Sequence, residues 1–440
     1  MKTMSPGPEQ HDEFHRSFHS PHSSRRQFLQ LSSAMLLGGV GTFTANSQGQ
    51  DGPLLSSEEE YWQQIRAQFA FTEAAVPMNA ANLCPSFRAV AESVMLLTAD
   101  IDRDCSFNNR GKFSGMLAET RKRVADQLRV TPEEVALLRN TSEANNVISN
   151  GIPLGSGDEV ILWEENHPTN NVAWDVRAAR FGFRVIRVAT PTVLTADTLL
   201  DAFVSRFTEQ TRVLALTHVS NVSGIHLPVK ELVRAAHARG IHVHVDGAQT
   251  WGAMALDLRT LNVDSFAASA HKWYMGPKEV GLLYVKAEHI DRIWPGVVAT
   301  GWGTDSQTRQ PGARKFESLG QRDDAALAGL GVAAEIHQQI GAERIEARIY
   351  QLAQRLKTGL LNEGLELLTP LGAELSFGVC IAKAPSDRAG QISNALYTEY
   401  GIAGAATGGI RLCPAIYNTF AHVDRAVAGV SALMRAHNLV

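Results

Sequence analysis

The chain has 440 residues, of which 44% are hydrophobic and 20% charged, and its formal net charge is −4 at pH 7. This length is enough for a large hydrophobic core and for more than one domain. The nearly balanced charge gives no electrostatic footprint for nucleic acid, and none of the four cysteines has the spacing of a zinc site or a disulfide-dense scaffold.

The first 50 residues have the pattern of an export leader. The Arg25-Arg26 pair begins a twin-arginine pattern, and the apolar run from Leu31 to Val40 is too short to span a membrane. We therefore expect a removable signal over residues 1–50, recognised by the twin-arginine export machinery, and a periplasmic or secreted protein with no stable membrane span. The alternative is a disordered tail with a chance Arg-Arg pair.

Residues 51–110 are predicted to form an N-terminal segment of short helices and loops, and residues 111–310 a large α/β domain. In the large domain, apolar strands alternate with amphipathic helices, which indicates a mostly parallel sheet with helices on both faces. Ligands of such sheets bind at the carboxyl ends of the strands. The predicted strands are 135–138, 159–163, 184–188, 213–216, 242–245 and 281–285, and the predicted helices are 115–128, 142–150, 168–180 and 229–238.

The pattern changes in residues 311–440. Long helices are predicted at 325–339 and 343–362. A smaller α+β unit follows, with strands near 375–381 and 409–413 and helices near 389–400 and 423–436.

The strongest chemical pattern follows the strand at 242–245. Asp246 ends that strand, and Lys272 comes later in a stretch of small residues. A lysine can form a Schiff base with the aldehyde of pyridoxal 5'-phosphate (PLP), and an aspartate can keep the pyridine nitrogen protonated. A pyridinium nitrogen would also supply the partner that a buried carboxylate needs. We therefore predict PLP as the cofactor.

Other polar residues also follow predicted strands. Thr141 and Ser142 lie at the turn into a helix and can hold phosphate with the backbone amides, although simple helix capping explains them equally. His167 can stack on the cofactor ring, or it can be a surface histidine before Pro168. Asn221 can bond the phenolic oxygen of the cofactor or the substrate carboxylate, or it can be a turn residue.

The stretches around Asp246 and Lys272 contribute further candidates. Gln249 can reach the phenolic oxygen, and Ser269 and His271 can donate to phosphate. The alternative for Asp246 is a metal site with His242 and His244, which share its face of the strand. No further set of ligands at suitable spacing supports that alternative, so we expect no metal.

At these residues the chain resembles the class V aminotransferase family of PLP enzymes, which includes cysteine desulfurases, isopenicillin N epimerase and kynureninase. The resemblance extends from Asn79 to the C-terminus. It implies PLP fold type I, with a large domain whose mostly parallel sheet is covered by helices on both faces, plus a smaller C-terminal α+β domain. It also implies a homodimer, with Lys272 and His167 as catalytic residues. The implied cofactor-binding residues are Thr141, Ser142, His167, Asn221, Asp246, Gln249, Ser269, His271 and Lys272.

Four more residues take roles from the resemblance. Arg411 is similar to the family's late arginine, which implies a clamp for the α-carboxylate of the substrate. Trp302 lies in a stretch similar to one that reaches the cofactor of the neighbouring subunit. Asn82 is implied to touch the substrate at the entrance. Arg322 can bind a second carboxylate of the substrate, or it can pair with a neighbouring aspartate on the surface.

The resemblance implies an enzyme that acts on an amino group of an amino acid or amino-acid-derived metabolite through an external aldimine. Transamination, epimerisation of the isopenicillin N type and C–S or C–N bond cleavage all stay open. Persulfide-forming desulfurases of the family carry a cysteine in the loop before the late arginine, whereas residues 402–408 contain none. The sequence therefore disfavours a persulfide-type cysteine desulfurase. The competing classes are a PLP-binding module without turnover and a metal hydrolase using His242, His244 and Asp246.

Overall fold

The computed structural model describes residues 57–299 and 310–439 of the chain. Two units are distinguished, Met1–Tyr61 and Trp62–Val440. Helix α2 (Glu58–Arg66) begins in the first unit, and every later element belongs to the second. The predicted leader, with Arg25 and Arg26, and the predicted cofactor contact Trp302 lie outside the described residues.

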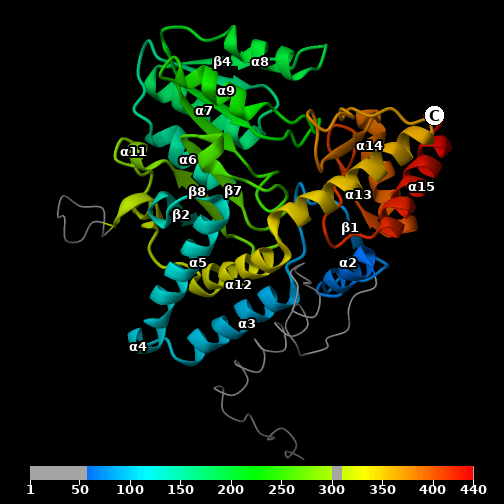
Figure 1. Ribbon diagram of the computed structural model, residues 1–440, viewed down its shortest axis with the longest axis horizontal. Helices are drawn as coiled ribbons and strands as arrows, with labels where there is room; N and C mark the ends of the chain where they lie inside the picture. Colours follow the sequence, from blue (N-terminus) through cyan, green and yellow to red (C-terminus); the bar gives the residue numbers. More distant parts are fainter. Residues whose placement is uncertain (1–56, 300–309, 440) are drawn as a thin grey trace, which may run out of the picture. The chain divides into compact units, whose positions relative to one another are not determined.

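A seven-stranded sheet forms the centre of the second unit, in the order β2-β8-β7-β6-β5-β3-β4 (Figure 1). The five neighbours from β4 to β7 run parallel, whereas β8 is antiparallel to both β7 and β2. The α/β class and the mostly parallel sheet are thus as predicted. The strands are β2 (Val135–Leu138), β3 (Glu159–Trp163), β4 (Arg184–Val188), β5 (Thr211–Thr217), β6 (His242–Asp246), β7 (Ser265–Ser269) and β8 (Gly281–Val285).

Both faces of this sheet are buried. Successive side chains of a strand point to opposite faces, so Val213 and Ala215 of β5 share one face and Leu214 lies on the other. The first face packs with α6, while Leu214 is fully buried as well. Strands covered on both faces are continuous apolar runs, which is why β3 and β5 were recognisable from sequence. The helices that follow the strands are α6 (Thr141–Gly151), α7 (Pro168–Phe181), α8 (Ala196–Val204), α9 (Val229–His237), α10 (Leu258–Leu261) and α11 (Ala287–Ile290).

Three predictions about the elements need correction. Strand β7 was not predicted, because Ser265–Ser269 is a run of mostly small residues rather than an apolar or alternating one. Helix α3 (Arg88–Arg103) is 16 residues long, where short helices were expected. The cap of α6 is Asn140, whose side chain accepts a hydrogen bond from the Glu143 backbone at 2.9 Å, and not Ser142.

The elements before β2 and those between α11 and α13 pack around the sheet domain. Helix α12 packs against both α5 and α3 (Figure 1). The remaining elements of these parts are β1 (Val76–Pro77), α4 (Phe107–Arg110), α5 (Lys112–Leu128), η1 (Pro132–Glu134), η2 (Gly312–Glu317), α12 (Asp324–Ile340) and α13 (Ala342–Asn362).

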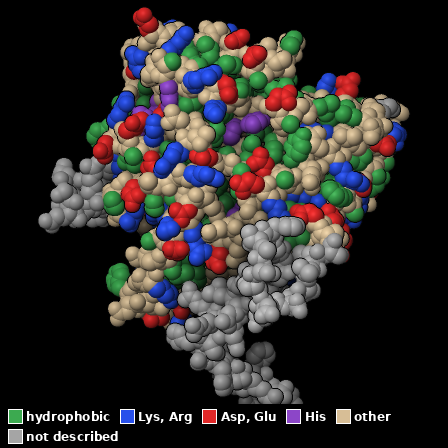
Figure 2. Space-filling view, in the orientation of Figure 1, with side chains coloured by type: hydrophobic (Ala, Val, Ile, Leu, Met, Phe, Trp, Pro, Cys, Tyr) green, Lys and Arg blue, Asp and Glu red, His purple; other side chains and the backbone are tan. Residues whose placement is uncertain are grey.

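The C-terminal part is a smaller α+β arrangement around a three-stranded sheet in the order β11-β12-β9. Its apolar core joins α13, α14 and α15 with side chains from these strands. The elements are β9 (Cys380–Ala382), α14 (Ser386–Tyr400), β10 (Ile402–Ala403), β11 (Ala405–Ala406), β12 (Ile410–Leu412) and α15 (Phe420–Ala436). Throughout the described ranges, no helix has both the length and the apolar character needed to cross a bilayer. Acidic and basic side chains are interspersed on the face shown in Figure 2.

Candidate active site

Lys272 lies in the stretch that follows β7, at the carboxyl edge of the parallel strands. Its side chain keeps partial exposure to solvent while protein atoms surround it. Burial lowers the pKa of the Lys272 amine; the negative charge of Asp246 opposes this shift and the positive charge of Arg411 adds to it. The lysine, the aspartate and the arginine that were predicted to form one site therefore lie within electrostatic reach of one another.

Asp246 is held by a chain of hydrogen bonds that runs under the sheet face covered by α6. Asn145 of α6 donates to Asp246 Oδ2 at 2.8 Å, and the Ala248 backbone donates to Oδ1 at 3.0 Å. The oxygen of the Asn145 amide lies 2.9 Å from His244 Nε2, and His244 Nδ1 lies 2.8 Å from the Ser265 hydroxyl.

The direction of this chain follows from its ends. A carboxylate only accepts hydrogen bonds, so Asn145 presents its NH₂ to Asp246 and its oxygen to His244. His244 must then carry its proton on Nε2 and accept at Nδ1 from the Ser265 hydroxyl. Burial lowers the pKa of His244 to about 3, which keeps the ring neutral. These hydrogen bonds fix the orientation of Asp246 and bring no charge to it.

The start of α6 and the end of β7 meet at a second polar group. The Thr141 backbone donates to the Ser269 hydroxyl at 2.8 Å, and the two hydroxyls lie 2.7 Å apart. Backbone amides at a helix start attract anions, and both hydroxyls are donors as well. The structure thus brings Thr141 and Ser269 together. The Ser142 hydroxyl is directed elsewhere and donates to the hydroxyl of Thr169, in the first turn of α7, at 3.4 Å.

His167 caps the start of α7, before Pro168. Its Nδ1 accepts from the Thr169 backbone at 3.3 Å and lies 2.8 Å from the Thr169 hydroxyl, which leaves Nε2 as the protonated nitrogen of the neutral ring. Burial lowers the pKa of His167, and the charge of Lys272 lowers it further, while Asp246 opposes both. His167 is therefore a neutral, oriented ring beside Lys272 and Asp246.

Arg411 of β12 connects this edge of the sheet to the C-terminal part. Its guanidinium donates to the Asn221 backbone oxygen at 2.9 Å and to Asn79 Oδ1 at 3.1 Å. Both acceptors are neutral, and within the described residues no carboxylate lies at ion-pair distance from Arg411. The buried Nε of Arg411 and the buried side-chain oxygen of Asn221 also have no protein partner. Arg411 is a largely buried cation that can take a ligand carboxylate.

The other predicted residues divide between this site and its surroundings. Gln249 accepts a hydrogen bond at 2.8 Å from Nε1 of Trp273, the residue that follows Lys272. It donates to the Ala81 backbone oxygen at 3.1 Å. His271 adjoins Lys272, and burial lowers its pKa to about 4. Asn82 is exposed, and it is Asn79 of the same segment that contacts Arg411. Arg322 donates to the Leu137 backbone oxygen at 2.6 Å, and its role toward a second substrate carboxylate stays a prediction.

Two thiols lie close to Lys272, and sequence reasoning assigned neither to the site. Cys84 and Cys413 are both buried, and the positive charge of Lys272 acts on each. Burial raises the pKa of Cys84 to about 12, and Tyr417 OH lies 3.4 Å from its sulfur. Cys105 is exposed, and neither it nor Cys84 forms a disulfide in the structure.

The residues fit the predicted cofactor in four respects. A lysine whose pKa is lowered suits Schiff-base formation, and a buried, oriented carboxylate suits a pyridinium nitrogen. The Thr141 and Ser269 donors at a helix start suit a phosphate. The unpartnered polar atom of Asn221 is the kind of buried group that a bound ligand satisfies.

Gly247 directly follows Asp246 at the end of β6. A Cβ at this position would meet Phe266 Cζ at 1.8 Å. Glycine is therefore required for packing of the β6 end against Phe266 of β7.

Comparisons with known proteins agree with this geometry. The family model described as "Aminotransferase class-V" matches residues 94–425. A curated cysteine desulfurase of Cronobacter sakazakii is 31% identical over 340 residues, which cover 70% of this chain and 79% of that protein. The solved cysteine desulfurase CsdA of Escherichia coli, in an S-sulfonic acid form, aligns with a TM-score of 0.75 at 25% identity, over 85% of this chain and 98% of that one. A solved C-DES mutant with glycine covalently linked to its PLP cofactor has the same fold, with a TM-score of 0.74 at 23% identity, over 83% of this chain and 98% of that one.

These relatives contradict one prediction. The absence of a cysteine from residues 402–408 was used to disfavour a persulfide-type cysteine desulfurase, yet the relatives carry that activity in their names. The inference treated one loop as the only source of a thiol. In the structure, Cys84 and Cys413 approach Lys272 from two other segments of the chain.

Proposed function

The chain belongs to the class V aminotransferase family and uses PLP as its cofactor, and from this premise we propose that it cleaves the carbon–sulfur bond of cysteine or a closely related amino acid. The observation that carries the proposal is the name of its curated relatives, cysteine desulfurase, over most of their length. The site of this chain supports it, because a carboxylate clamp, a Schiff-base lysine and two thiols lie near one another.

The residues of the chain divide the work of such a reaction. PLP supplies an electron sink that weakens the bonds to the α-carbon of an amino substrate. Lys272 would hold the cofactor aldehyde, and because burial lowers its pKa, its amine is more readily neutral and suited to take up a proton. Asp246, oriented by Asn145, would face the ring nitrogen and favour its protonated form. Arg411 binds the α-carboxylate through the guanidinium that has no anionic partner of its own.

The two buried thiols are the candidates to receive sulfur from the substrate. Cys84 contacts Tyr417 and is joined to the lysine stretch by a hydrogen bond from its backbone to the His271 oxygen at 2.8 Å. Cys413 follows β12, the strand of Arg411. Because a thiolate attacks sulfur and a thiol does not, substrate binding would have to favour the ionised form of the thiol involved.

The test is turnover of the PLP-loaded protein with L-cysteine and a reductant. We expect alanine and sulfide in equal amounts, and loss of both in Lys272→Ala. Cys84→Ser and Cys413→Ser, measured separately, identify the thiol that the reaction needs. Pyridoxamine phosphate formation without sulfide would instead show a transaminase, and exchange of the α-proton for deuterium without alanine would show an epimerase.

We propose that the protein acts after export in folded form through the twin-arginine pathway. The support is the Arg25-Arg26 pair followed by a short apolar run. Cell fractionation of the full chain, beside an Arg25→Lys, Arg26→Lys double variant, tests this proposal. Equal amounts of both in the cytoplasm would refute it.

We also propose a homodimer, as is common in this family. The support is a set of exposed apolar side chains, with Val172 and Val176 on α7 and Val297 and Val298 before residue 300. Light scattering after size-exclusion chromatography tests the proposal, and a monomer at micromolar concentration would refute it.

A further inference from the structure

Three side chains that are able to bind a metal ion lie at the amino ends of the parallel strands, away from Lys272. His242 begins β6, Asp264 directly precedes β7, and His289 lies in α11. One ligand atom from each of the three lies within 4.8 Å of the other two. Asp246 closes the strand that His242 begins, and at ~3.3 Å per residue the two sites are about 13 Å apart.

The carboxylate of this group is buried, and the side chains that contact it are histidines. Asp264 Oδ1 accepts from His289 Nε2 at 3.0 Å, and Oδ2 accepts from His237 Nε2 at 2.9 Å and from the Val243 backbone at 2.7 Å. No lysine or arginine of the described ranges forms an ion pair with Asp264, whose side chain is 3% exposed. A buried carboxylate needs hydrogen bonds, a cation or a metal ion as its partner.

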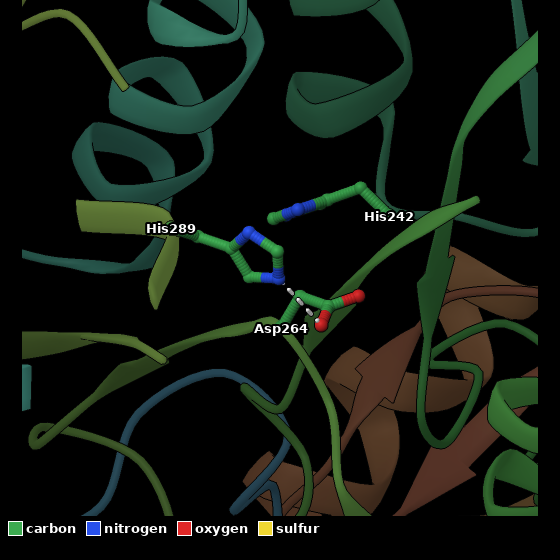
Figure 3. Close-up of side chains that lie close together, drawn as sticks. All are labelled: His242, Asp264 and His289. Carbon is green, nitrogen blue, oxygen red and sulfur yellow. Dashed lines mark hydrogen bonds and ion pairs between the residues drawn. The ribbon is translucent and has the colours of Figure 1, made fainter. Parts of the chain in front are cut away.

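The third side chain points to the same place. Figure 3 shows the His242 ring directed toward the His289 ring, beside the Asp264 carboxylate. The two imidazole centroids are 5.0 Å apart. Imidazole nitrogens are common metal ligands, so both rings and the carboxylate offer an atom to the same point.

We propose that His242, Asp264 and His289 bind a divalent transition-metal ion, best fitted by Zn²⁺, with a water molecule as the fourth ligand. Two imidazoles and one carboxylate are ligands that Zn²⁺ accepts in tetrahedral geometry. Ligand atoms about 2.0–2.2 Å from zinc lie about 3.3 Å from one another. The 3.0 Å separation of Asp264 Oδ1 and His289 Nε2 is already close to that value, and the metal takes the place of the proton between them.

The neighbours of these ligands are arranged to hold them. His237 and the Val243 backbone bind Asp264 Oδ2, which leaves Oδ1 for the metal. The Ser265 hydroxyl lies 3.1 Å from His242 Nε2 and restrains that ring. Such outer contacts orient metal ligands in proteins. The ion would join β6, the start of β7 and α11, so its role is to stabilise the amino end of the sheet.

The experiment uses the PLP-loaded protein after treatment with a chelator and dialysis. Titration with Co²⁺, a spectroscopic substitute for Zn²⁺, should give one equivalent of bound metal with visible bands of a tetrahedral site. His289→Gln and His242→Gln should each weaken binding at least tenfold, whereas the control His437→Gln, at the end of α15, should bind as the unchanged protein does. PLP absorbance should stay the same throughout.

Bound metal should also raise the unfolding temperature of the unchanged protein and leave that of His289→Gln unaltered. The proposal is overturned if less than a stoichiometric amount of metal binds, or if the two ligand variants bind it as tightly as the control. Because the readouts are metal binding and stability, they do not depend on turnover of cysteine.

Discussion

Asn145 is the residue on which the orientation of Asp246 depends. Replacing it by alanine removes one of the two hydrogen bonds to the carboxylate and leaves the buried His244 Nε2–H without an acceptor, which costs about 1–3 kcal/mol. We expect Asn145→Ala to weaken PLP binding about tenfold, or ~1.4 kcal/mol. Absorbance titration of the cofactor-free protein with PLP measures this.

The matched control is Asn146→Ala, the next residue of the same helix. Its side chain bonds the Ser142 backbone oxygen within α6 and has no part in the chain that reaches Asp246. Equal loss of PLP affinity in the two variants would mean that α6 as a whole, and not the Asn145 amide, supports the cofactor.

Arg411 gives a second prediction at the scale of single residues. Lysine retains the charge at this position but loses the planar fork that donates to Asn79 and Asn221 while binding a carboxylate. Hydrogen bonds to charged groups contribute about 1.5–3 kcal/mol, so we expect Arg411→Lys to raise KM for cysteine about 10- to 100-fold with a smaller change in kcat. Cysteamine, which lacks the carboxylate, should be bound equally by both proteins; a parallel loss would show that Arg411 only supports the fold.

The sequence identified the residues of the site whose neighbours in the chain make a pattern. Asp246 and Lys272 were found because each follows a recognisable strand or small-residue stretch. Asn79 was missed because its partner, Arg411, lies 332 residues away and nothing local marks the contact. Asn145 was missed for the same reason, since a single asparagine inside a helix carries no signal until the strand that it faces is known.

Among the elements, β2, β3 and β8 were predictable because they are buried and mostly apolar, and their bounds match those predicted. The bounds of the partly exposed edge strand β4 match as well, whereas the small-residue strand β7 could not be distinguished from a loop. β7 is recognisable only from its neighbours, β6 and β8, which supply its hydrogen bonds and its packing. The sequence pattern of one segment does not predict its contacts with neighbouring strands.

The close packing of α12 against α3 gives a prediction at the scale of elements. A Cβ on Gly329 of α12 would lie 2.5 Å from Val94 Cγ2 of α3 and 3.3 Å from Pro277 Cγ. Valine has few alternative rotamers in a helix, so we expect Gly329→Ala to destabilise the protein by about 1–3 kcal/mol. Urea unfolding measures the change.

Gly115 of α5 is the control for that substitution. Nothing lies within 4 Å of a Cβ added there, and alanine is the better helix former by about 0.5–1 kcal/mol. Gly115→Ala should therefore stabilise the protein. Stabilisation by both substitutions would contradict the close packing of α12 on α3.

At the scale of the whole molecule, a buried histidine makes global stability depend on pH. His337 of α12 stacks on Tyr274 with ring centroids 4.1 Å apart and lies 2.9 Å from the Tyr274 backbone oxygen, and burial lowers its pKa to about 4. Below pH ~6.5 the unfolded chain binds a proton here that the folded protein does not, so stability falls as the pH falls. The contribution lost between pH 7.5 and 5.5 is about 1 kcal/mol.

The measurement compares the free energy of unfolding at these two pH values. His337→Gln cannot titrate, so the difference between the two should be about 1 kcal/mol smaller than in the unchanged protein, whatever the variant's absolute stability. His437→Gln should leave the difference as it was. An unchanged difference in His337→Gln would show that His337 is protonated in the folded protein.

The contact between Asn79 and Arg411 can form only late in translation. The two residues are separated by 332 positions, and Ala80 and Met78 bond the backbone of Cys413 in the same region. At ~5–20 residues per second on the ribosome, Asn79 emerges roughly 17–66 s before its partner. During that time the segment around Asn79 lacks its contacts with Arg411 and Cys413. The carboxylate-binding site of Arg411 is therefore completed only when translation is almost finished. A nascent chain stalled before β12 should therefore lack the clamp, even if its Lys272 region has already folded.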